Sequence, residues 1–273
     1  MSQGSPQFIV AGPAQDQRRL ATLVSRGAPA GPGPGLMWLP GLMSDMSSTK
    51  ASAMAGFAEA HGLASTRFDY SGHGQSEGRF ADGTIGRWLE DAETVFTELT
   101  SGPQILVGSS MGGYIALLML KRMVERGSTI ANRIMGMVLI APAWDMTEEL
   151  MWNEFPVSVK TILQRDGVWP RPSPYGAPYP ITMRLIEEGR THLLARKTFR
   201  PGCPVHIIHG LIDPDVPWEH TMDLMSFLDG PDIGVTAVPE GEHRLSRPED
   251  IALILDTIGR MVAGIRSSGR ATT

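Results

Sequence analysis

Short apolar runs alternate with longer, periodically apolar segments along most of the chain. The longer segments carry apolar residues at helical spacing and predict helices at 48–62, 84–102, 112–127 and 247–265. The short runs predict strands at 19–26, 36–41, 65–72, 104–110, 134–143, 203–210 and 233–243. Near-continuous apolar content at 104–107, 137–140 and 205–208 is typical of central strands buried on both faces. This alternation predicts an α/β fold with a mostly parallel central sheet and helices on both faces.

One stretch interrupts the alternation. From residue 145 to about residue 200 the chain carries three apolar clusters that contain Trp or Phe, together with many prolines. The stretch is short and shows no pattern for a sheet of its own. We therefore expect a cap inserted into a single domain that spans residues 1–273, rather than a second domain.

Composition supports a globular protein and limits its partners. Apolar residues make up 42% of the chain and charged residues 19%, which is enough to build a buried core. The formal net charge of −5 offers no basic surface for phosphates, so nucleic acid is not an expected partner. Cys203 is the only cysteine, which excludes an internal disulfide and suits a reducing compartment.

Targeting and membrane signals are also missing from the pattern. The first residues lack a basic start followed by a sustained apolar segment, and no stretch approaches the roughly 18 apolar residues of a membrane-spanning helix. We expect a soluble protein of the cytoplasm without a membrane span. The sequence carries no indication of the oligomeric state.

A turn of small residues joins the strand predicted at 104–110 to the helix predicted at 112–127. Gly108-Ser109-Ser110-Met111-Gly112 matches the pattern G-x-S-x-G, in which a strained strand-to-helix turn needs small neighbours two residues before and after the central serine. Ser110 is then a candidate nucleophile at a helix N-terminus, where amides favour developing negative charge. Ser109 has the wrong phase, because Val107 and Met111 stand where it would need glycines. The alternative is a tight turn with an incidental serine.

A serine hydroxyl needs a base and an orienting acid to act as a nucleophile. Where such a turn carries the nucleophile, the acid and then the histidine follow the serine along the chain. Asp213 lies just beyond the strand predicted at 203–210, and His243 lies in the loop before the last predicted helix. Each lies where a predicted strand ends, on the sheet edge where such folds place their sites. Ser110, Asp213 and His243 are the predicted catalytic triad.

An oxyanion hole requires two backbone N–H groups directed at the substrate carbonyl oxygen. Met111, the residue after the nucleophile, is the first candidate donor. Leu42, in the loop after the third strand, is the second, and Gly41 before it allows a close approach of the backbone. The alternative for Leu42 is an ordinary loop after a strand.

Methionine is frequent near the segments expected around the mouth of the site, and it fills irregular apolar space. We therefore expect an apolar channel for an acyl chain under the cap. The candidate substrate-binding residues are Met43, Met146, Met151 and Trp152, and Met37 and Phe155 could extend the channel. Ordinary core packing is the alternative for many of these methionines.

Three further residue types invite a functional interpretation that the pattern does not favour. His206 and His209 are three residues apart on a predicted strand, so they point to opposite faces and are not a metal pair. We expect Cys203 to pack in the protein interior. Ser71 and His73 follow a strand in a Gly-assisted turn, and we expect them to stabilise that turn.

The motifs together resemble the α/β-hydrolase superfamily. They are "PGLMSDMSSTKA", "RFDYSGHGQSEG", "TIGRWLEDA", "GPQILVGSSMGG", "HGLIDPDVPW" and "EHR". "FDYSG", "LVGSSMGG" and "DVPW" are similar to the family of the palmitoyl-protein thioesterase abhydrolase domain-containing protein ten and its bacterial relatives. The resemblance runs from about residue 36 to 260 and is weakest in the cap.

This resemblance implies a serine hydrolase without a cofactor that cleaves acyl thioesters on cysteine and acyl-glucuronide esters, so the partner is a small-molecule or acylated-protein substrate. Ser110, Asp213 and His243 fall on the family's triad positions. Its pattern H-G-x-x-D-x-x-V-P assigns the acid to Asp213, and we expect Asp215 to face solvent or to cap the helix that starts near residue 218. A bacterial enzyme is expected, because no mitochondrial presequence is evident.

Other functions remain open at this point. The same triad on this fold also serves C–C bond hydrolases and perhydrolases. Dehalogenases and epoxide hydrolases are disfavoured, because they place an aspartate nucleophile where Ser110 stands. A non-catalytic binding module would be favoured only if a triad residue were missing.

Overall fold

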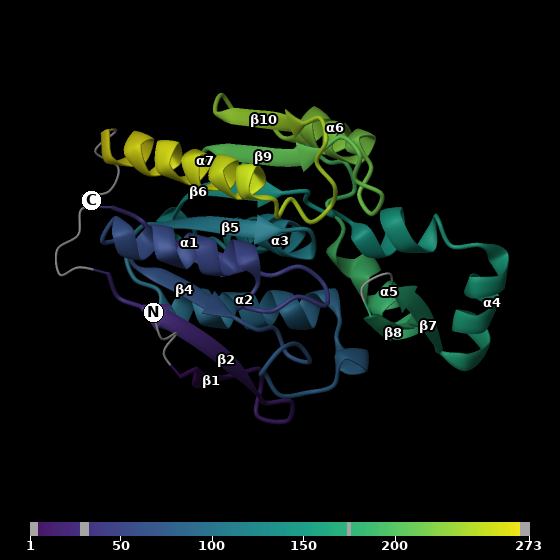
Figure 1. The fold of residues 1–273 in the computed structure, drawn as a ribbon. Coiled ribbons are helices and arrows are strands. Elements are labelled where there is room, and N and C mark those ends of the chain that lie inside the picture. The colour runs from purple at the N-terminus through teal and green to yellow at the C-terminus, as the bar shows by residue number, and fades with distance from the viewer. Residues whose placement is uncertain (1–4, 28–32, 174–175, 268–273) are drawn as a thin grey trace.

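An eight-stranded sheet forms the centre of the computed structural model, which describes residues 5–27, 33–173 and 176–267 (Figure 1). The strand order is β1-β2-β4-β3-β5-β6-β9-β10. Neighbouring strands from β4 to β10 are parallel, whereas β2 is antiparallel to both of its neighbours, so the predicted mostly parallel sheet is confirmed. The strands of this sheet are β1 Gln7–Ala11, β2 Arg18–Ser25, β3 Gly35–Leu39, β4 Ser65–Phe68, β5 Gln104–Ser109, β6 Ile134–Ile140, β9 Val205–Gly210 and β10 Ile233–Val238.

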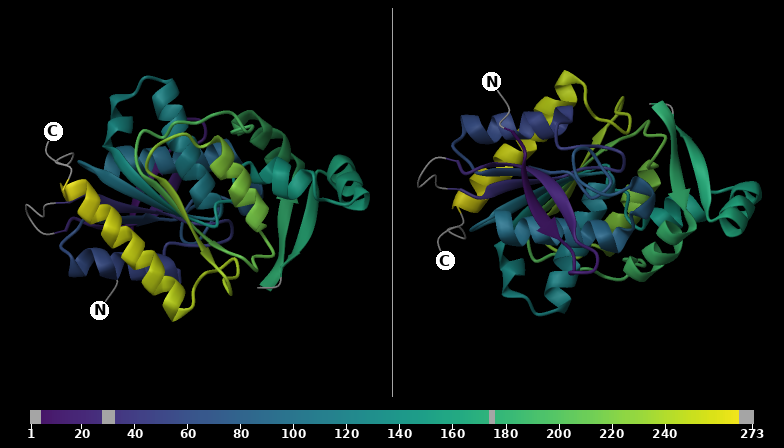
Figure 2. Two further views of the ribbon diagram at one scale, coloured as in Figure 1. Left: turned by 90° about the horizontal axis from the view of Figure 1, so that it is seen from above. Right: turned by 90° about the horizontal axis from the view of Figure 1, so that it is seen from below.

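Helices cover both faces of the sheet, as predicted. α1 and α7 lie side by side on one face, and α2 and α3 pack together on the other, as the two views of Figure 2 show. These helices and α6 are α1 Thr49–Ala60, α2 Ile85–Leu99, α3 Met111–Glu125, α6 Trp218–Phe227 and α7 Pro248–Ser267. Short 3₁₀ helices are η1 Phe80–Asp82 and η2 Thr129–Arg133. Within the described residues, no helix combines the length and apolar character that crossing a bilayer requires.

The two faces of the sheet belong to two separate apolar cores. Leu36 and Trp38 of β3 pack in the core under α1 and α7, whereas Met37 and Leu39 pack in the core under α2 and α3. Successive side chains of a strand point to opposite faces. Because helices cover both faces, all four of these side chains are buried. Burial on both sides explains why the central strands carry almost continuous apolar runs.

One strand of this sheet was not expected from the sequence. β1 pairs with β2 at the sheet edge, and its side chains Phe8 and Val10 are exposed. Its apolar run, residues 8–11, is only four residues long and is followed by Gly12 and Pro13, so its pattern alone does not distinguish a strand from a loop.

The segment between β6 and β9 contains the stretch expected to be a cap, and it projects beyond the ends of the central strands (Figure 1). The expectation that this stretch has no sheet of its own is wrong, because β7 and β8 form an antiparallel two-stranded sheet. Both strands are rich in proline, and Pro170 lies opposite Pro180. Each strand of a two-stranded sheet is an edge, where proline is tolerated. The segment comprises the π-helix η3 Thr147–Trp152, α4 Val157–Asp166, β7 Val168–Ser173, β8 Gly176–Thr182, α5 Met183–Gly189 and η4 Arg190–His192.

Asp145 joins the two ends of the β6–β9 segment. Its carboxylate accepts hydrogen bonds from the amides of Leu194 (2.7 Å) and Ala195 (2.9 Å). Burial raises the pKa of this carboxyl. Asp145 and Ala195 both adopt positive φ, at 47° and 54°, an uncommon conformation for residues other than glycine. The segment therefore leaves and rejoins the sheet through two bends tied together by one side chain.

Candidate active site

Ser110 stands at a strained turn between β5 and α3. Its φ of 54° and ψ of −119° are outside the regions that residues with a side chain usually adopt. A Cβ added to Gly108 would come within 2.5 Å of the Gly112 carbonyl oxygen, and a Cβ on Gly112 would overlap the carbonyl oxygen of Leu39. Both positions therefore require glycine, which is the steric basis for choosing Ser110 over Ser109.

A chain of hydrogen bonds connects three side chains from separate parts of the sequence. Nε2 of His243 lies 3.0 Å from Oγ of Ser110, and Nδ1 of His243 lies 2.7 Å from Oδ2 of Asp213. An ionised carboxylate only accepts, so Nδ1 carries the proton and Nε2 is free to accept from the serine hydroxyl. The structure thus brings together the three residues predicted as a triad, in the arrangement in which a histidine can take the serine proton.

The Asp213 carboxylate is fully buried and held as an anion. Its Oδ1 accepts the backbone amides of Asp215 (2.8 Å) and Val216 (2.9 Å), in addition to the bond from His243 at Oδ2. Burial alone would raise the pKa of Asp213, but the hydrogen bond and charge of His243 and the two amides outweigh it, so the pKa is lowered. Asp215 itself is exposed, and α6 begins at Trp218 without a side-chain cap. Of its two expected positions, Asp215 takes the solvent-facing one.

His209 supports the loop that carries Asp213. It is buried at the end of β9, where Nε2–H donates to the Val216 carbonyl at 2.9 Å and Nδ1 accepts from the hydroxyl of Thr221 at 2.7 Å. Burial lowers the pKa of His209, which keeps the ring neutral in this tautomer. His206 instead bonds Thr236 on the neighbouring strand at 2.8 Å. The two histidines therefore have different partners, as expected for opposite faces of a strand.

The backbone groups predicted as an oxyanion hole lie beside Ser110. Met111 is the first residue of α3, so its amide has no acceptor within the helix. The loop that contains Leu42 passes close to the serine, because a Cβ on Gly41 would lie 3.3 Å from the Cβ of Ser110. Glycine at position 41 therefore permits the approach that was inferred from the sequence.

A cavity of about 730 Å³ opens in front of Ser110 and His243. The loop after β3, the start of α1, the β6–β9 segment and the loops that carry Asp215 and His243 form its walls. Met43, Met146 and Met151 line it, as predicted from the sequence, together with Leu42 and Leu150. Apolar side chains of the β6–β9 segment thus face the serine across the cavity.

Trp152 does not line this cavity, so its assignment as a substrate-binding residue is wrong. Its ring is covered by the side chains of Lys160 and Arg190, at 5.6 Å and 5.0 Å from the ring centroid. The cause is the π-helix at 147–152, which turns through more residues than an α-helix and changes which side chains share a face. Met37 and Phe155 are also absent from the lining, because Met37 lies in the sheet core and Phe155 packs against Trp169.

Comparison with known proteins places this geometry in a family. The family model described as "Serine aminopeptidase, S33" matches residues 37–178, just over half of the chain. The palmitoyl-protein thioesterase ABHD10, mitochondrial, of Bos taurus is 34% identical over 236 residues, which cover 85% of this chain and 74% of that protein. This chain is an α/β hydrolase of the serine aminopeptidase S33 family. The human palmitoyl-protein thioesterase ABHD10, mitochondrial, is likewise 34% identical to the hydrolase, over 234 residues that cover 85% of this chain and 74% of that protein.

Solved structures agree with this assignment. The α/β-hydrolase domain-containing protein 10 from mouse matches the hydrolase with a TM-score of 0.82 and 31% identity, covering 96% of this chain and all of that one. A crystal structure from Agrobacterium vitis S4 matches with a TM-score of 0.90 and 40% identity, covering 94% of this chain and 98% of that one. The α/β-hydrolase fold predicted from the sequence is therefore confirmed.

A group of potential metal ligands in the hydrolase coincides with the hydrogen-bonded triad. Ligand atoms of Asp213, Asp215 and His243 lie within 4.8 Å of one another. Both ring nitrogens of His243 are already engaged, one with Asp213 and one with Ser110. These three side chains therefore fit a hydrogen-bonded catalytic triad better than a set of metal ligands.

The residues expected to serve as packing or turn groups in the hydrolase have partners away from Ser110. The amide and hydroxyl of Ser71 donate to Asp91 of α2, which also accepts from Arg18. His73 is buried in an aromatic cluster, and burial lowers its pKa to about 4. Cys203 packs against the core under α2 and α3.

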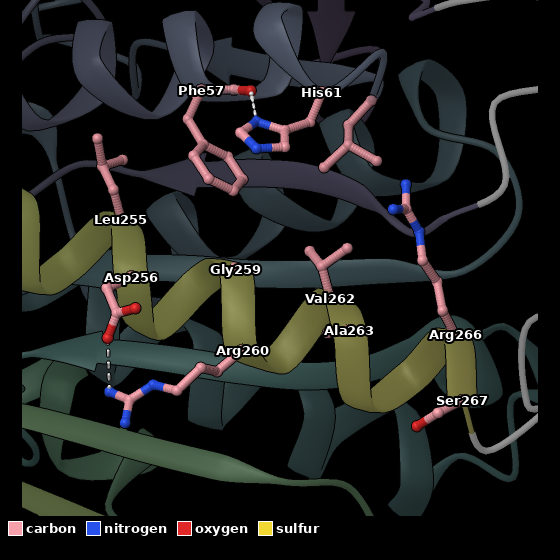
Figure 3. A pocket seen from close by; sticks show the side chains of 11 residues that line it. Phe57, His61, Leu255, Asp256, Gly259, Arg260, Val262, Ala263, Arg266 and Ser267 are labelled. Carbon is pink, nitrogen blue, oxygen red and sulfur yellow. Dashed lines mark hydrogen bonds and ion pairs between the residues drawn. The ribbon is translucent and has the colours of Figure 1, made fainter.

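A second hollow in the hydrolase, of about 850 Å³, lies between α1 and α7 (Figure 3). Its walls include Phe57, Leu255 and Val262, and an ion pair joins Asp256 to Arg260 at its edge. Neither Ser110 nor His243 reaches it. Its size alone does not make it a reaction site: among the described residues that line it, the hydroxyl of Ser267 donates to the Gly264 carbonyl and His61 bonds the Phe57 carbonyl, so neither forms a nucleophile–base pair in the structure.

Charged residues of the hydrolase's cavity were not found by the sequence analysis. Lys50, Arg171 and Arg244 line the cavity together with Asp215, and Trp38 lies in its wall. Lys50 donates a hydrogen bond to the carbonyl oxygen of Arg244, the residue after His243. Single lysines and arginines carry no motif. Lys50 and Arg244 meet only because the fold brings α1 beside the last loop, and Arg171 comes from β7.

Proposed function

We propose that this hydrolase cleaves carboxylic esters and thioesters through an acyl-enzyme formed on Ser110. The observation that carries the proposal is the hydrogen-bonded chain Ser110–His243–Asp213 at the wall of a partly apolar cavity. The curated relatives that share about a third of the sequence are named palmitoyl-protein thioesterases, which supports acyl transfer to water.

The geometry supports a two-step reaction. Ser110 Oγ attacks the acyl carbonyl carbon while its proton passes to Nε2 of His243, and the negative charge on the carbonyl oxygen is met by the amides of Met111 and Leu42. The C–O or C–S bond then breaks as His243 returns the proton to the leaving oxygen or sulfur. Water adds to the acyl-enzyme with His243 as base, and the carboxylic acid departs as Ser110 recovers its proton. Asp213 stabilises the imidazolium in both steps.

The acyl part of the substrate fits the apolar wall of the cavity. Met146, Leu150 and Met151 come from the β6–β9 segment, which we propose to act as a cap over the acyl chain. Chains of medium length should therefore exceed acetyl in kcat/KM, because each buried CH₂ contributes about 0.8 kcal/mol. S-acylated cysteine, including the palmitoyl thioester, and acyl glucuronides are the substrate classes that the resemblance to relatives suggests.

An aminopeptidase activity, which the family description mentions, is less well supported by the cavity. Acidic side chains attract a substrate's terminal ammonium group, whereas cationic side chains repel it. The charged residues that line this cavity within the described chain are three cations, Lys50, Arg171 and Arg244, and one exposed acid, Asp215. An ester or thioester without an ammonium group matches this lining better.

A direct activity test compares two serine variants. We expect Ser110→Ala to lower kcat for p-nitrophenyl butyrate and for a butyryl thioester by about 10⁴-fold or more, because the nucleophile is lost. Ser109→Ala is the matched control and should keep most of the activity. Similar losses in both variants, with both proteins folded by circular dichroism, would contradict the assignment of the nucleophile.

A further inference from the structure

The cavity in front of Ser110 carries the opposite charge to the chain as a whole. The formal net charge of the protein is −5. Within the described part of the chain, the cavity is nevertheless lined by Lys50, Arg171 and Arg244 against the single acid Asp215. Cations in a partly enclosed cleft focus the electric field and raise the local concentration of anions. The positive charge of the cavity lining therefore does not follow from the net charge of the protein, which is negative.

Lys50 and Arg244 form the wall of the cavity next to His243. The ammonium group of Lys50 donates to the Arg244 carbonyl oxygen, which ties α1 to the loop that carries His243. Burial, together with the charge of Arg244, lowers the pKa of Lys50 to about 8, while the acid Asp250 acts in the opposite direction. Asp250 itself accepts two hydrogen bonds from the guanidinium of Arg247, at 2.8 Å and 3.0 Å, and one from the backbone amide of Arg247, at 3.1 Å. The positive charge of Lys50 thus lies beside an acid that another cation already binds.

The N-terminus of α1 adds to the same wall. Ser48, Thr49 and Lys50, at the start of this helix, all line the cavity. The first turn contains no acidic residue, and the hydroxyl of Ser48 does not cap the helix. The first amides of a helix lack acceptors within it and carry a partial positive charge, so they favour an anion.

Two buried polar atoms of this wall also lack a partner. Trp38, which is 1% exposed, lines the cavity, and its indole Nε1 has no hydrogen-bond partner among the described residues. The same is true of Oγ of Ser48. A buried donor without an acceptor costs free energy, so such atoms indicate a missing ligand group or water. Both residues line the same cavity as Lys50, and Ser48 lies two residues before it.

We propose that the leaving group of the substrate carries a carboxylate or phosphate, which binds between Lys50, Arg244 and the N-terminus of α1. His243 must deliver its proton to the leaving atom, so the departing group lies on the His243 side of the cavity. Lys50 and Arg244 form that side. The apolar residues of the β6–β9 segment are then left for the acyl chain. This proposal rests on the proposed hydrolysis at Ser110.

A pair of thioesters that differ only in charge provides the test. One is the butyryl thioester of 3-mercaptopropionate, and the other is the butyryl thioester of methyl 3-mercaptopropionate. Thiol release measured with Ellman's reagent gives kcat/KM for each. We expect the wild-type protein to prefer the anionic thioester by about tenfold, the effect of one charge-assisted hydrogen bond. The butyryl thioester of 2-mercaptoethyl phosphate distinguishes a phosphate preference from a carboxylate preference.

Variants of Lys50 separate binding from positioning. Lys50→Met should reduce the anionic-to-neutral ratio of kcat/KM towards one, through a higher KM for the anionic thioester, and Lys50→Arg should restore most of the ratio. Lys160→Met is the matched control, because Lys160 lies over Trp152 and outside the cavity. A wild-type ratio near one would overturn the proposal. An equal loss of kcat/KM for both thioesters in Lys50→Met would also overturn the proposal. Lys50 would then serve only to hold the loop that contains Arg244 in place.

Failure of the proposed hydrolysis can be distinguished from failure of this site. If the wild-type protein cleaves neither thioester, the proposed function is wrong. The anion site is then decided by the affinity of Ser110→Ala for the two thioesters, measured by calorimetry. Tighter binding of the anionic thioester supports the site, and equal affinity overturns it.

Discussion

Replacement of Asp213 by asparagine separates the orienting acid from its neighbour Asp215. The Asp213 carboxylate accepts from two backbone amides at Oδ1 and from Nδ1 of His243 at Oδ2. Asparagine has one acceptor oxygen, which the two amides would retain. Its NH₂ group would then face His243, so the imidazole would accept at Nδ1 and carry its proton at Nε2. In that tautomer His243 has no lone pair for the hydroxyl of Ser110.

The size of the effect follows from this change of tautomer. The same replacement in a serine protease lowers kcat about 10⁴-fold, which corresponds to roughly 5.5 kcal/mol of barrier. We expect a loss of at least about a hundred-fold here. The charge-assisted hydrogen bond to His243 is exchanged for a neutral one, which should lower the free energy of unfolding by about 1 kcal/mol, while the two amide bonds keep the loop in place.

The assay measures kcat for p-nitrophenyl butyrate and the thermal melting curve of each variant. Asp215→Asn is the matched control, because the side chain of Asp215 is exposed and only its backbone amide binds Asp213. We expect this control to keep its turnover and to change stability by no more than about 0.5 kcal/mol. An inactive Asp215→Asn beside an active Asp213→Asn would refute the assignment of the acid.

Three further predictions follow from the geometry. Gly112→Ala should lower the free energy of unfolding by about 1–3 kcal/mol in chemical denaturation, because its Cβ would overlap the Leu39 carbonyl; unchanged stability would contradict the strained turn. Met151→Trp should shift the chain-length optimum of p-nitrophenyl esters towards shorter acyl groups, whereas Trp152→Phe should not; an equal shift in both would argue against the cavity wall. Raising the pH from 7 to 9 should reduce the preference for the anionic thioester, because Lys50, with a pKa of about 8, loses its charge; a ratio that stays constant and is the same in Lys50→Met would exclude Lys50 as its source.

Elements with a clear apolar period were predictable from the sequence. The buried strands β5, β6 and β9 carry apolar runs because both of their faces are covered, and the turn at Ser110 is visible because sterics demand glycine at 108 and 112. Asp213 and His243 follow strands, so their order along the chain was enough to place them at one sheet edge. The hydrogen bonds of the structure then join all three side chains.

The remainder depends on tertiary contacts that leave little trace in the sequence. The hairpin β7–β8 contains prolines, which disfavour a strand prediction. The π-helix at 147–152 changes the helical spacing of side chains, so the sequence alone does not show that Met151 faces the cavity and Trp152 does not. Lys50 and Arg244 are 194 positions apart and meet only in the folded protein. A pattern along the chain cannot report a wall assembled from such distant residues.

The central claim is that Ser110 is the nucleophile activated by His243. Incubation of the protein with a fluorophosphonate, followed by digestion and mass spectrometry, identifies the side chain that becomes covalently bound. We predict one adduct, located on Ser110, that is lost in Ser110→Ala and strongly slowed in His243→Ala because the serine then lacks its base. An adduct on Ser109, or a rate of labelling that does not depend on His243, would contradict the claim.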